Sequence, residues 1–157
     1  MAEGRIEFEL KFTGASAELA ALPASDFFAA IAAEGGAWER LSSSYYDTND
    51  GVLGARGLSL RLREEGADIV QAVKTKEVDA ASRLEIETPL VKPSQFPSET
   101  GYDDIDQLIA DCGDRLLPLA KTTVDRWSAV VRFKGAEIEL AVDLGSAQAL
   151  DGEGRAF

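Results

Sequence analysis

Hydrophobic and charged residues alternate one by one in several segments of this chain, and this pattern constrains the fold more than any other feature. In the first such segment, Ile6 to Phe12, every second residue is large and apolar, and Glu7, Glu9 and Lys11 lie between them. Alternate side chains of a β-strand leave opposite faces of the sheet. The period therefore predicts a strand that carries two carboxylates and an ammonium in one row, with an apolar row behind them. A row of this kind can hold a divalent cation beside a phosphate.

The same alternation recurs in later segments, where charged residues share one face and Leu, Ile or Val lie opposite. The charges that share a face are Arg61 with Arg63, Lys74 with Lys76, Arg83 with Glu85 and Glu87, Arg126 with Arg132, and Glu137 with Glu139 and Asp143. After the first strand, further strands are expected at Trp38–Thr48, Leu58–Arg63, Ile69–Lys76, Ser82–Leu90, Leu119–Phe133 and Glu137–Leu144. Helices are expected at Ser16–Leu22, Ser25–Ala33 and Asp103–Cys112.

Seven strands with short connections and a few inserted helices indicate an α+β fold built on an antiparallel sheet or barrel. An up-and-down barrel usually closes on an even number of strands. The tail Ser146–Phe157 stops where one more strand is expected. We therefore expect residues 1–157 to be a single domain of the eight-stranded type, shortened before its last strand.

The composition narrows the chemistry that such a sheet can support. The 157 residues carry a net charge of −12, no histidine and one cysteine. Without histidine, a metal must be held by oxygen ligands, and serine–histidine or cysteine–histidine nucleophiles are excluded. The acidic balance argues against binding of nucleic acid across the surface. The single cysteine, the lack of an apolar membrane span and the lack of a secretory signal favour the cytoplasm.

The charged faces have two interpretations. An antiparallel sheet with one face on a core and one in water shows this alternation without any function. However, a solvated face usually mixes Ser, Thr and Gln with its charges, and here the polar positions of five strands are almost entirely Glu, Asp, Lys and Arg. Rolled inward, they would line a lumen with a basic wall and an acidic wall. Because unpaired charges in a low-dielectric lumen are costly, a polyphosphate with its metal would neutralise both walls.

Smaller signals have simpler interpretations. Trp38 and Trp127 are expected to pack rather than to stack on a base, and one of the adjacent Tyr45 and Tyr46 should point inward. The acidic residues between the third and fourth predicted strands, Glu64, Glu65 and Asp68, are expected at a solvated hairpin tip.

The ordered motifs resemble the CYTH domain family, the triphosphate tunnel metalloenzymes. The first segment is similar to the family's ExExK signature. The later motifs follow in the family's order: Tyr45-Tyr46-Asp47-Thr48, Leu60-Arg61-Leu62-Arg63, Val73-Lys74-Thr75-Lys76, Ser82-Arg83-Leu84-Glu85-Ile86-Glu87, and Arg126-Trp127 with Glu139 and Asp143-Leu144-Gly145. The match covers essentially the whole chain, and its style most resembles the bacterial inorganic triphosphatases. Members close the tunnel with a further strand that bears another E-x-E pair, and this chain ends where that strand should begin.

The resemblance implies an eight-stranded tunnel that binds triphosphates with Mg²⁺ or Mn²⁺. Position by position, it implies metal carboxylates at Glu7, Glu9, Glu85, Glu87 and Asp143. It implies phosphate contacts from Lys11, Arg61, Arg63, Lys74 and Arg126, and less directly from Lys76 and Arg83. Glu9 and Lys11 are the residues expected to take part in catalysis, with a carboxylate such as Glu9 activating the attacking water.

The principal expectation is thus metal-dependent hydrolysis of inorganic triphosphate to pyrophosphate and phosphate. A class IV-type adenylate cyclase is the second enzyme class, because attack by a ribose hydroxyl in place of water would use the same site. A non-catalytic module that binds polyphosphate is an alternative of another class, as is a purely structural β-domain. Nucleoside triphosphates remain alternative ligands, neither nucleic acid nor membrane is expected as a partner, and a homodimer is one way to fill the open edge.

Overall fold

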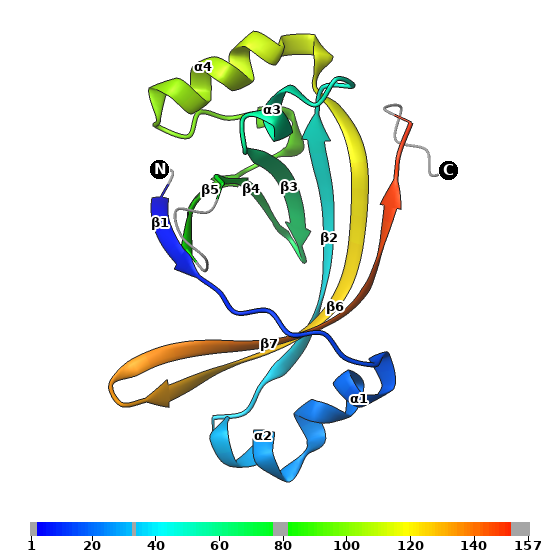
Figure 1. Ribbon diagram of the computed structural model, residues 1–157, viewed down its shortest axis with the longest axis vertical. Coiled ribbons are helices and arrows are strands. Elements are labelled where there is room, and N and C mark those ends of the chain that lie inside the picture. The colour runs from blue at the N-terminus through cyan, green and yellow to red at the C-terminus, as the bar shows by residue number, and fades with distance from the viewer. Residues whose placement is uncertain (1–2, 33, 77–81, 152–157) are drawn as a thin grey trace.

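The computed structural model describes residues 3–32, 34–76 and 82–151, in which seven strands form one antiparallel sheet. The strands are β1 (Glu3–Phe8), β2 (Ala37–Asp47), β3 (Ser59–Glu65), β4 (Asp68–Lys74), β5 (Ser82–Leu90), β6 (Leu117–Phe133) and β7 (Ala136–Ala149). Their order across the sheet is β1-β5-β4-β3-β2-β6-β7, and the sheet curls into a half-barrel with β1 and β7 as its edges (Figure 1). The expected α+β antiparallel fold is therefore confirmed.

Short helices lie between the strands. They are α1 (Ser16–Ala21), α2 (Asp26–Ile31), α3 (Val52–Ala55) and α4 (Asp103–Cys112), with 3₁₀ turns η1 (Leu22–Ala24), η2 (Pro93–Gln95) and η3 (Gly113–Arg115). The predicted position of α4 is correct, and α1 and α2 are each shorter than predicted. Ala33, the last residue of the predicted second helix, lies outside the described residues. Within the described ranges, no helix is both long and apolar enough to cross a membrane.

In the middle strands β3 and β4, Leu60 and Val73 face away from the concave side and pack against the helices. Leu60 of β3 and Val73 of β4 form a buried cluster with Leu53 of α3 and with Ile109 and Cys112 of α4. Each of these side chains is at most 6% exposed. Burial of large aliphatic side chains contributes about 1.5–3 kcal/mol each, so this layer fixes the middle strands of the sheet. Their charged neighbours are left for the concave face.

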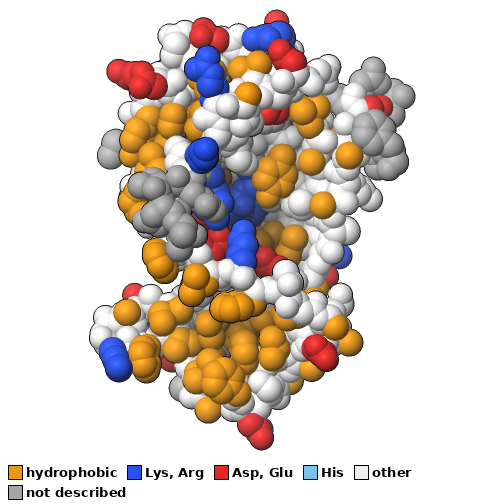
Figure 2. All heavy atoms as spheres, in the orientation of Figure 1, with side chains coloured by type: hydrophobic (Ala, Val, Ile, Leu, Met, Phe, Trp, Pro, Cys, Tyr) orange, Lys and Arg blue, Asp and Glu red, His pale blue; other side chains and the backbone are white. Residues whose placement is uncertain are grey.

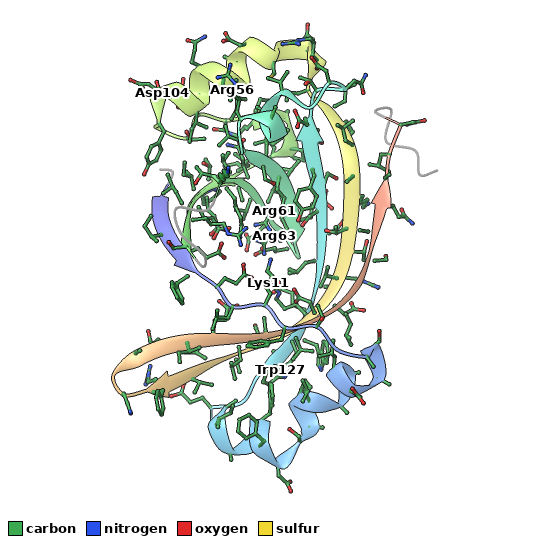
Figure 3. The ribbon with its side chains drawn as sticks, in the orientation of Figure 1. Lys11, Arg56, Arg61, Arg63, Asp104 and Trp127 are labelled. Atoms are coloured by element: carbon green, nitrogen blue, oxygen red, sulfur yellow. The ribbon has the colours of Figure 1, made fainter. Side chains whose placement is uncertain are left out.

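A second cluster lies at the other end of the molecule. Trp127 and Ala129 of β6 and Val142 of β7 pack there with Ala32, and Phe28 of α2 lies against Trp127 with ring centroids 5.5 Å apart. Figure 3 shows Trp127 among these helices, away from the concave face. The expectation that Trp127 is a packing residue is confirmed.

The turn between β6 and β7 fixes which residues of these two strands face each other. Lys134 and Gly135 form a two-residue connection with φ values of 50° and 85°. Two successive positive φ angles are typical of the hairpin turn that matches strand twist, and Gly adopts them without strain. The resulting register places Arg126 opposite Asp143.

The largest errors in the predicted strands lie at the ends of β1 and β7. β1 ends at Phe8, so Glu9 and Lys11 follow the strand instead of lying in it. β7 continues beyond Leu144 to Ala149, because β6 is long enough to pair with these extra residues. Residues 152–157, where a further strand was expected to begin, lie outside the described residues.

The apolar row of the first segment is present but is not buried. Ile6, Phe8, Leu10 and Phe12 are between 64% and 87% exposed. The alternation thus predicts the two faces of this segment correctly, although it does not predict that the apolar face remains in solvent.

Candidate active site

The concave face of the sheet holds a cavity of about 670 Å³, whose wall takes residues from all seven strands. Basic and acidic side chains gather in a hollow at the centre of the view in Figure 2, above an area of hydrophobic side chains. Eleven of the twelve residues that the sequence assigns to the site line this cavity: Glu7, Glu9, Lys11, Arg61, Arg63, Lys74, Arg83, Glu85, Glu87, Arg126 and Asp143. The twelfth, Lys76, follows the end of β4 and does not line it.

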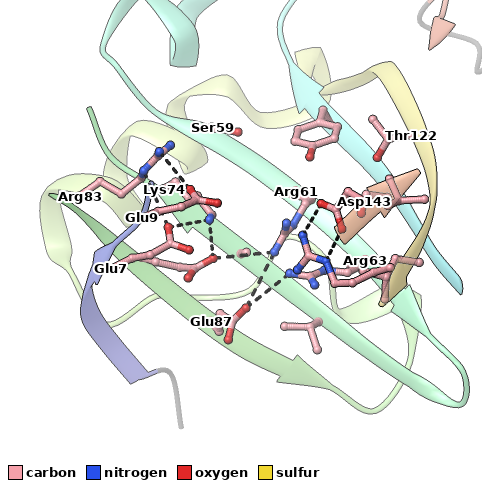
Figure 4. A pocket seen from close by; sticks show the side chains of 18 of the residues that line it. Glu7, Glu9, Ser59, Arg61, Arg63, Lys74, Arg83, Glu87, Thr122 and Asp143 are labelled. Carbon is pink, nitrogen blue, oxygen red and sulfur yellow. Dashed lines mark hydrogen bonds and ion pairs between the residues drawn. The ribbon is translucent and has the colours of Figure 1, made fainter. Parts of the chain in front are cut away.

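Lys74 lies between two carboxylates that come from different strands. Its Nζ donates a hydrogen bond of 2.7 Å to Oε2 of Glu7 on β1, and lies 3.1 Å from Oε1 of Glu85 on β5 (Figure 4). The Glu85 side chain is 2% exposed and that of Lys74 is 23% exposed. A carboxylate so deeply buried needs a close cation, so Lys74 allows Glu85 to remain charged inside the sheet.

Arg61 and Arg63 are the most enclosed cations of the cavity. Both project from β3 into the curl of the sheet, as Figure 3 shows, and their side chains are 13% and 12% exposed. Nη2 of Arg61 lies 3.8 Å from both Glu85 and Glu87, which is too long for a hydrogen bond. Burial and the neighbouring charge of Arg61 together lower the pKa of Arg63.

Three buried nitrogen atoms of this pair lack a hydrogen-bond partner among the described residues. They are Nε and Nη2 of Arg61 and Nε of Arg63. A buried donor without a partner costs about 1–3 kcal/mol, and charged donors are rarely left in that state. The arrangement therefore suits an incoming anion with several acceptor oxygens.

Arg126 is held differently, by a carboxylate directly opposite. Its Nε and Nη2 each donate a hydrogen bond of 2.7 Å to one oxygen of Asp143. This two-bond contact is the strongest geometry for an arginine and a carboxylate, and the bonded Asp143 raises the pKa of Arg126. Arg126 thus lines the cavity while its Nε and Nη2 are already bonded to Asp143.

The cavity end nearest β1 carries a looser group of charges. Arg83 lies 3.8 Å from Glu7 and 3.4 Å from Glu9, and the Lys11 ammonium lies 3.4 Å from Glu9. The Lys11 side chain is 72% exposed. An ion pair that involves so exposed a lysine contributes little to stability, so Lys11 can change partners at low cost.

The lumen does not have one basic and one acidic wall. Lys74 contacts Glu7 of β1 and Glu85 of β5. Arg83 contacts Glu7 and Glu9. Arg61 and Arg63 lie within 3.8 Å of Glu85 and Glu87, respectively. The prediction of unpaired charges is wrong for most of these groups, because the antiparallel register brings opposite charges of neighbouring strands together.

The donor set agrees with a hard divalent cation in chemistry, since all candidate ligands are carboxylate oxygens. Among the described residues, no three acidic or other ligating side chains converge tightly enough to hold a metal ion by themselves. Mg²⁺ is commonly bound by one or two carboxylates together with the phosphates of its substrate. Glu7 and Glu9, which face the cavity at its partly exposed end, fit that mode.

Residues that the sequence analysis did not assign to the site also line the cavity. Glu65, expected at a solvated hairpin tip, lies in the wall and contacts Arg63, whereas Glu64 and Asp68 are exposed as expected. The alternation does predict that Glu65 faces the cavity, because Glu65 continues the row of Arg61 and Arg63. One stretch of wall carries hydroxyl groups and no charge: Ser43, Tyr45, Ser59 and Thr122.

The Tyr45–Thr48 motif divides between the cavity and the scaffold. Tyr45 lines the cavity, and Tyr46 packs on Phe96 with ring centroids 4.4 Å apart. Asp47 accepts hydrogen bonds of 2.7–2.9 Å from the backbone N–H groups of Thr48, Leu53 and Gly54 at the start of α3. Its carboxylate therefore holds a helix start.

Comparison with known proteins identifies the family of this chain and supports its fold. The sequence model of the CYTH domain matches residues 5–152. A crystal structure from Bacillus halodurans, assigned provisionally as an adenylate cyclase, superposes with a TM-score of 0.52 at 16% identity, over 91% of this chain and 79% of the other. A cyclase candidate from Hippeastrum, described as having a dominant triphosphatase activity, gives a TM-score of 0.47 at 15% identity, over 91% of this chain and 78% of the other. A search of curated protein sequences gives no match.

Proposed function

The chain belongs to the CYTH domain family, and from this premise we propose that its cavity binds triphosphates and hydrolyses one of their phosphoanhydride bonds. The observation that carries the proposal is the arginine pair of β3, with three buried nitrogen donors that lack a partner among the described residues. A triphosphate offers many oxygen acceptors and enough negative charge to satisfy them. Inorganic triphosphate is the simplest ligand of this kind.

In the proposed mechanism, Arg61 and Arg63 bind the oxygens of the chain of phosphates, and Lys74 exchanges its carboxylate contacts for a phosphate contact. Neutralisation of these oxygens lets a water molecule attack a terminal phosphorus in line with the leaving group. The P–O bond to the leaving pyrophosphate breaks as the new bond forms, and Glu9 takes the water proton. Lys11, whose side chain is largely exposed at the cavity end, balances charge on the leaving group.

Glu7 and Glu9 would hold the divalent metal, together with oxygens of the substrate. Mg²⁺ or Mn²⁺ supplies Lewis-acid polarisation of phosphoryl oxygens when it is bound. We assign Glu85 mainly to Lys74, which lies 3.1 Å away, and Glu87 to the two arginines of β3. We assign Asp143 to orienting Arg126, which donates two hydrogen bonds to it. A metal-coordinating role for these three carboxylates would require them to leave those contacts.

One observation favours an organic triphosphate as the second candidate. The uncharged stretch of wall with Ser43, Tyr45, Ser59 and Thr122 adjoins the arginines, since Tyr45 is the cross-strand neighbour of Arg61. The whole cavity, at about 670 Å³, lies in the range of pockets that hold drug-sized ligands. With ATP, attack by water would give ADP and phosphate, and attack by the ribose 3′-hydroxyl would give cyclic AMP and pyrophosphate.

Phosphate release from inorganic triphosphate tests the proposal, with Mn²⁺ or Mg²⁺ and with EDTA. We expect metal-dependent release that is lost in Arg63→Ala and retained in Lys121→Ala, a control lysine on an exposed position of β6. Chromatography of the products from ATP separates hydrolysis from cyclisation. Calorimetric binding of triphosphate without any turnover would contradict the hydrolase and leave a binding module, and absence of both binding and turnover would contradict the proposal altogether.

A further inference from the structure

Glu65 is the third charged residue of one row on β3. Arg61, Arg63 and Glu65 occupy alternate positions of this strand and all three line the cavity. Glu64, its neighbour in the chain, points to the other face and is exposed. Two adjacent carboxylates at the end of the same strand thus lie in very different surroundings, and only one of them faces the site.

Glu65 makes the shortest contact that Arg63 has. Its Oε1 lies 2.7 Å from Nη1 of Arg63, and the two side chains are 29% and 12% exposed. The other terminal nitrogen, Nη2, lies 3.7 Å from Glu87, and the buried Nε has no partner among the described residues. Glu65 therefore holds one end of the guanidinium and leaves the opposite edge open.

The open edge is the one that binds oxyanions in pairs. A guanidinium can offer Nε and Nη2 side by side to two oxygens of one carboxylate or phosphate. Arg126 uses this same edge on Asp143, with two bonds of 2.7 Å. In Arg63 the contact with Glu65 occupies Nη1 alone, so along the edge formed by Nε and Nη2 the buried Nε has no hydrogen-bond partner among the described residues and Nη2 has only the long contact with Glu87.

We propose that Glu65 is a positioning residue, which fixes the Arg63 guanidinium so that its Nε–Nη2 edge faces the phosphate oxygens of the ligand. This inference rests on the proposed function and names a residue beyond those assigned to it. Without Glu65, Arg63 would be left next to the like charge of Arg61, on the same face two residues away. The side chain would then turn toward solvent or toward Glu87, and the ligand would have to bear the cost of ordering it.

The sign of the effect separates positioning from simple electrostatics. A carboxylate near an anion site repels the anion, so removing its charge should tighten binding if charge alone matters. A residue that orders the binding arginine has the opposite effect, since its loss weakens binding. Outer partners of metal ligands typically contribute about 10- to 100-fold in affinity or activity, and we expect an effect of similar order for the partner of a phosphate-binding arginine.

The experiment compares Glu65→Gln with Glu64→Gln, which removes the same charge one residue away on the exposed face. Isothermal titration with inorganic triphosphate is expected to give about tenfold weaker binding for Glu65→Gln than for Glu64→Gln. Equal or tighter binding by Glu65→Gln would overturn the inference. Glu65→Asp, which keeps the charge but shortens the reach, serves as the second variant if Glu65→Gln does not fold, and it too should bind more weakly than Glu64→Gln.

A ligand-free measurement keeps this test apart from the proposed function. The chemical shift of the Arg63 Nε–Hε resonance in a ¹⁵N correlation spectrum reports the local environment of its guanidinium. We expect it to shift in Glu65→Gln and to stay in place in Glu64→Gln. A shift without any triphosphate binding by the parent protein would support the positioning and refute the function, and an unshifted resonance would refute the positioning whatever the protein binds.

Discussion

Replacing Arg61 by lysine should weaken ligand binding without weakening the fold. The substitution keeps one positive charge near Glu85 and Glu87 but removes the guanidinium, and with it two buried nitrogens that have no partner among the described residues. Each such donor costs the folded state about 1–3 kcal/mol. Since lysine can extend its single ammonium toward the two carboxylates, we expect the free energy of unfolding to stay equal or to rise by about 2 kcal/mol.

Binding should change in the opposite direction. A hydrogen bond to a charged group contributes about 1.5–3 kcal/mol, and lysine can replace only one of the two contacts that Arg61 would offer. The loss of one such bond corresponds to about 10- to 100-fold weaker binding of inorganic triphosphate. Urea denaturation measures the free energy of unfolding, and titration calorimetry measures the affinity for triphosphate.

Arg40→Lys is the matched control, because Arg40 lies on β2 outside the cavity and its side chain is 72% exposed. It should leave both stability and affinity close to the parent values. The reasoning fails if Arg61→Lys lowers the free energy of unfolding by more than about 1 kcal/mol while triphosphate affinity is unchanged. That result would mean that Arg61 stabilises the ligand-free sheet and does not bind the anion.

Two further substitutions test the scaffold of the site. Lys74→Ala removes the cation between Glu7 and the buried Glu85. Because Lys74 is partly exposed, we expect the free energy of unfolding to fall by about 2 kcal/mol in urea denaturation. Lys121→Ala is the control and should change this free energy little; an equal effect of both substitutions would refute the role of the buried pair. Asp47→Ala removes the carboxylate that accepts backbone hydrogen bonds from Thr48 and from Leu53 and Gly54 of α3, and should cost about 2 kcal/mol in urea denaturation while Asn49→Ala in the adjacent turn costs little. A loss of triphosphate affinity in Asp47→Ala would show that this residue does more than hold the helix start.

The period of the sequence predicts most of the strands, because two-residue alternation follows directly from the geometry of a half-buried sheet. It fails at both edges of the sheet. β1 ends at Phe8 although the alternation continues to Phe12, and Phe8 pairs with Ser82, the first described residue of β5. β7 extends through Gly145–Ala149, small and polar residues with low strand propensity, because β6 offers partners there. Pairing between distant segments decides these ends, and a local pattern cannot show it.

The residues of the cavity follow from the same alternation, but their partners do not. Knowing that Lys74, Glu85 and Glu7 each face inward says nothing of which of them meet. The register of β4 with β5 and of β5 with β1 brings them to within 3.1 Å or less of the Lys74 ammonium. Glu65 was not predicted for a different reason. An acidic residue beside a turn is usually solvated, and this turn signal conflicts with the alternation that places Glu65 on the same face as Arg61 and Arg63.

The uneven compensation of charge indicates where a triphosphate gains most on entering the cavity. Lys74 and Arg126 already have close carboxylate partners, so an incoming phosphate must displace these contacts before it gains any energy. Arg61 and Arg63 present buried donors that lack such partners among the described residues, and a phosphate oxygen there replaces no existing hydrogen bond. Binding should therefore depend more strongly on the two arginines of β3 than on Lys74, although all three line one cavity. The same asymmetry explains how the sheet folds with so many charges inside, since most of them lie beside an opposite charge and the buried charged donors without a hydrogen bond among the described residues are nitrogens of the arginine pair.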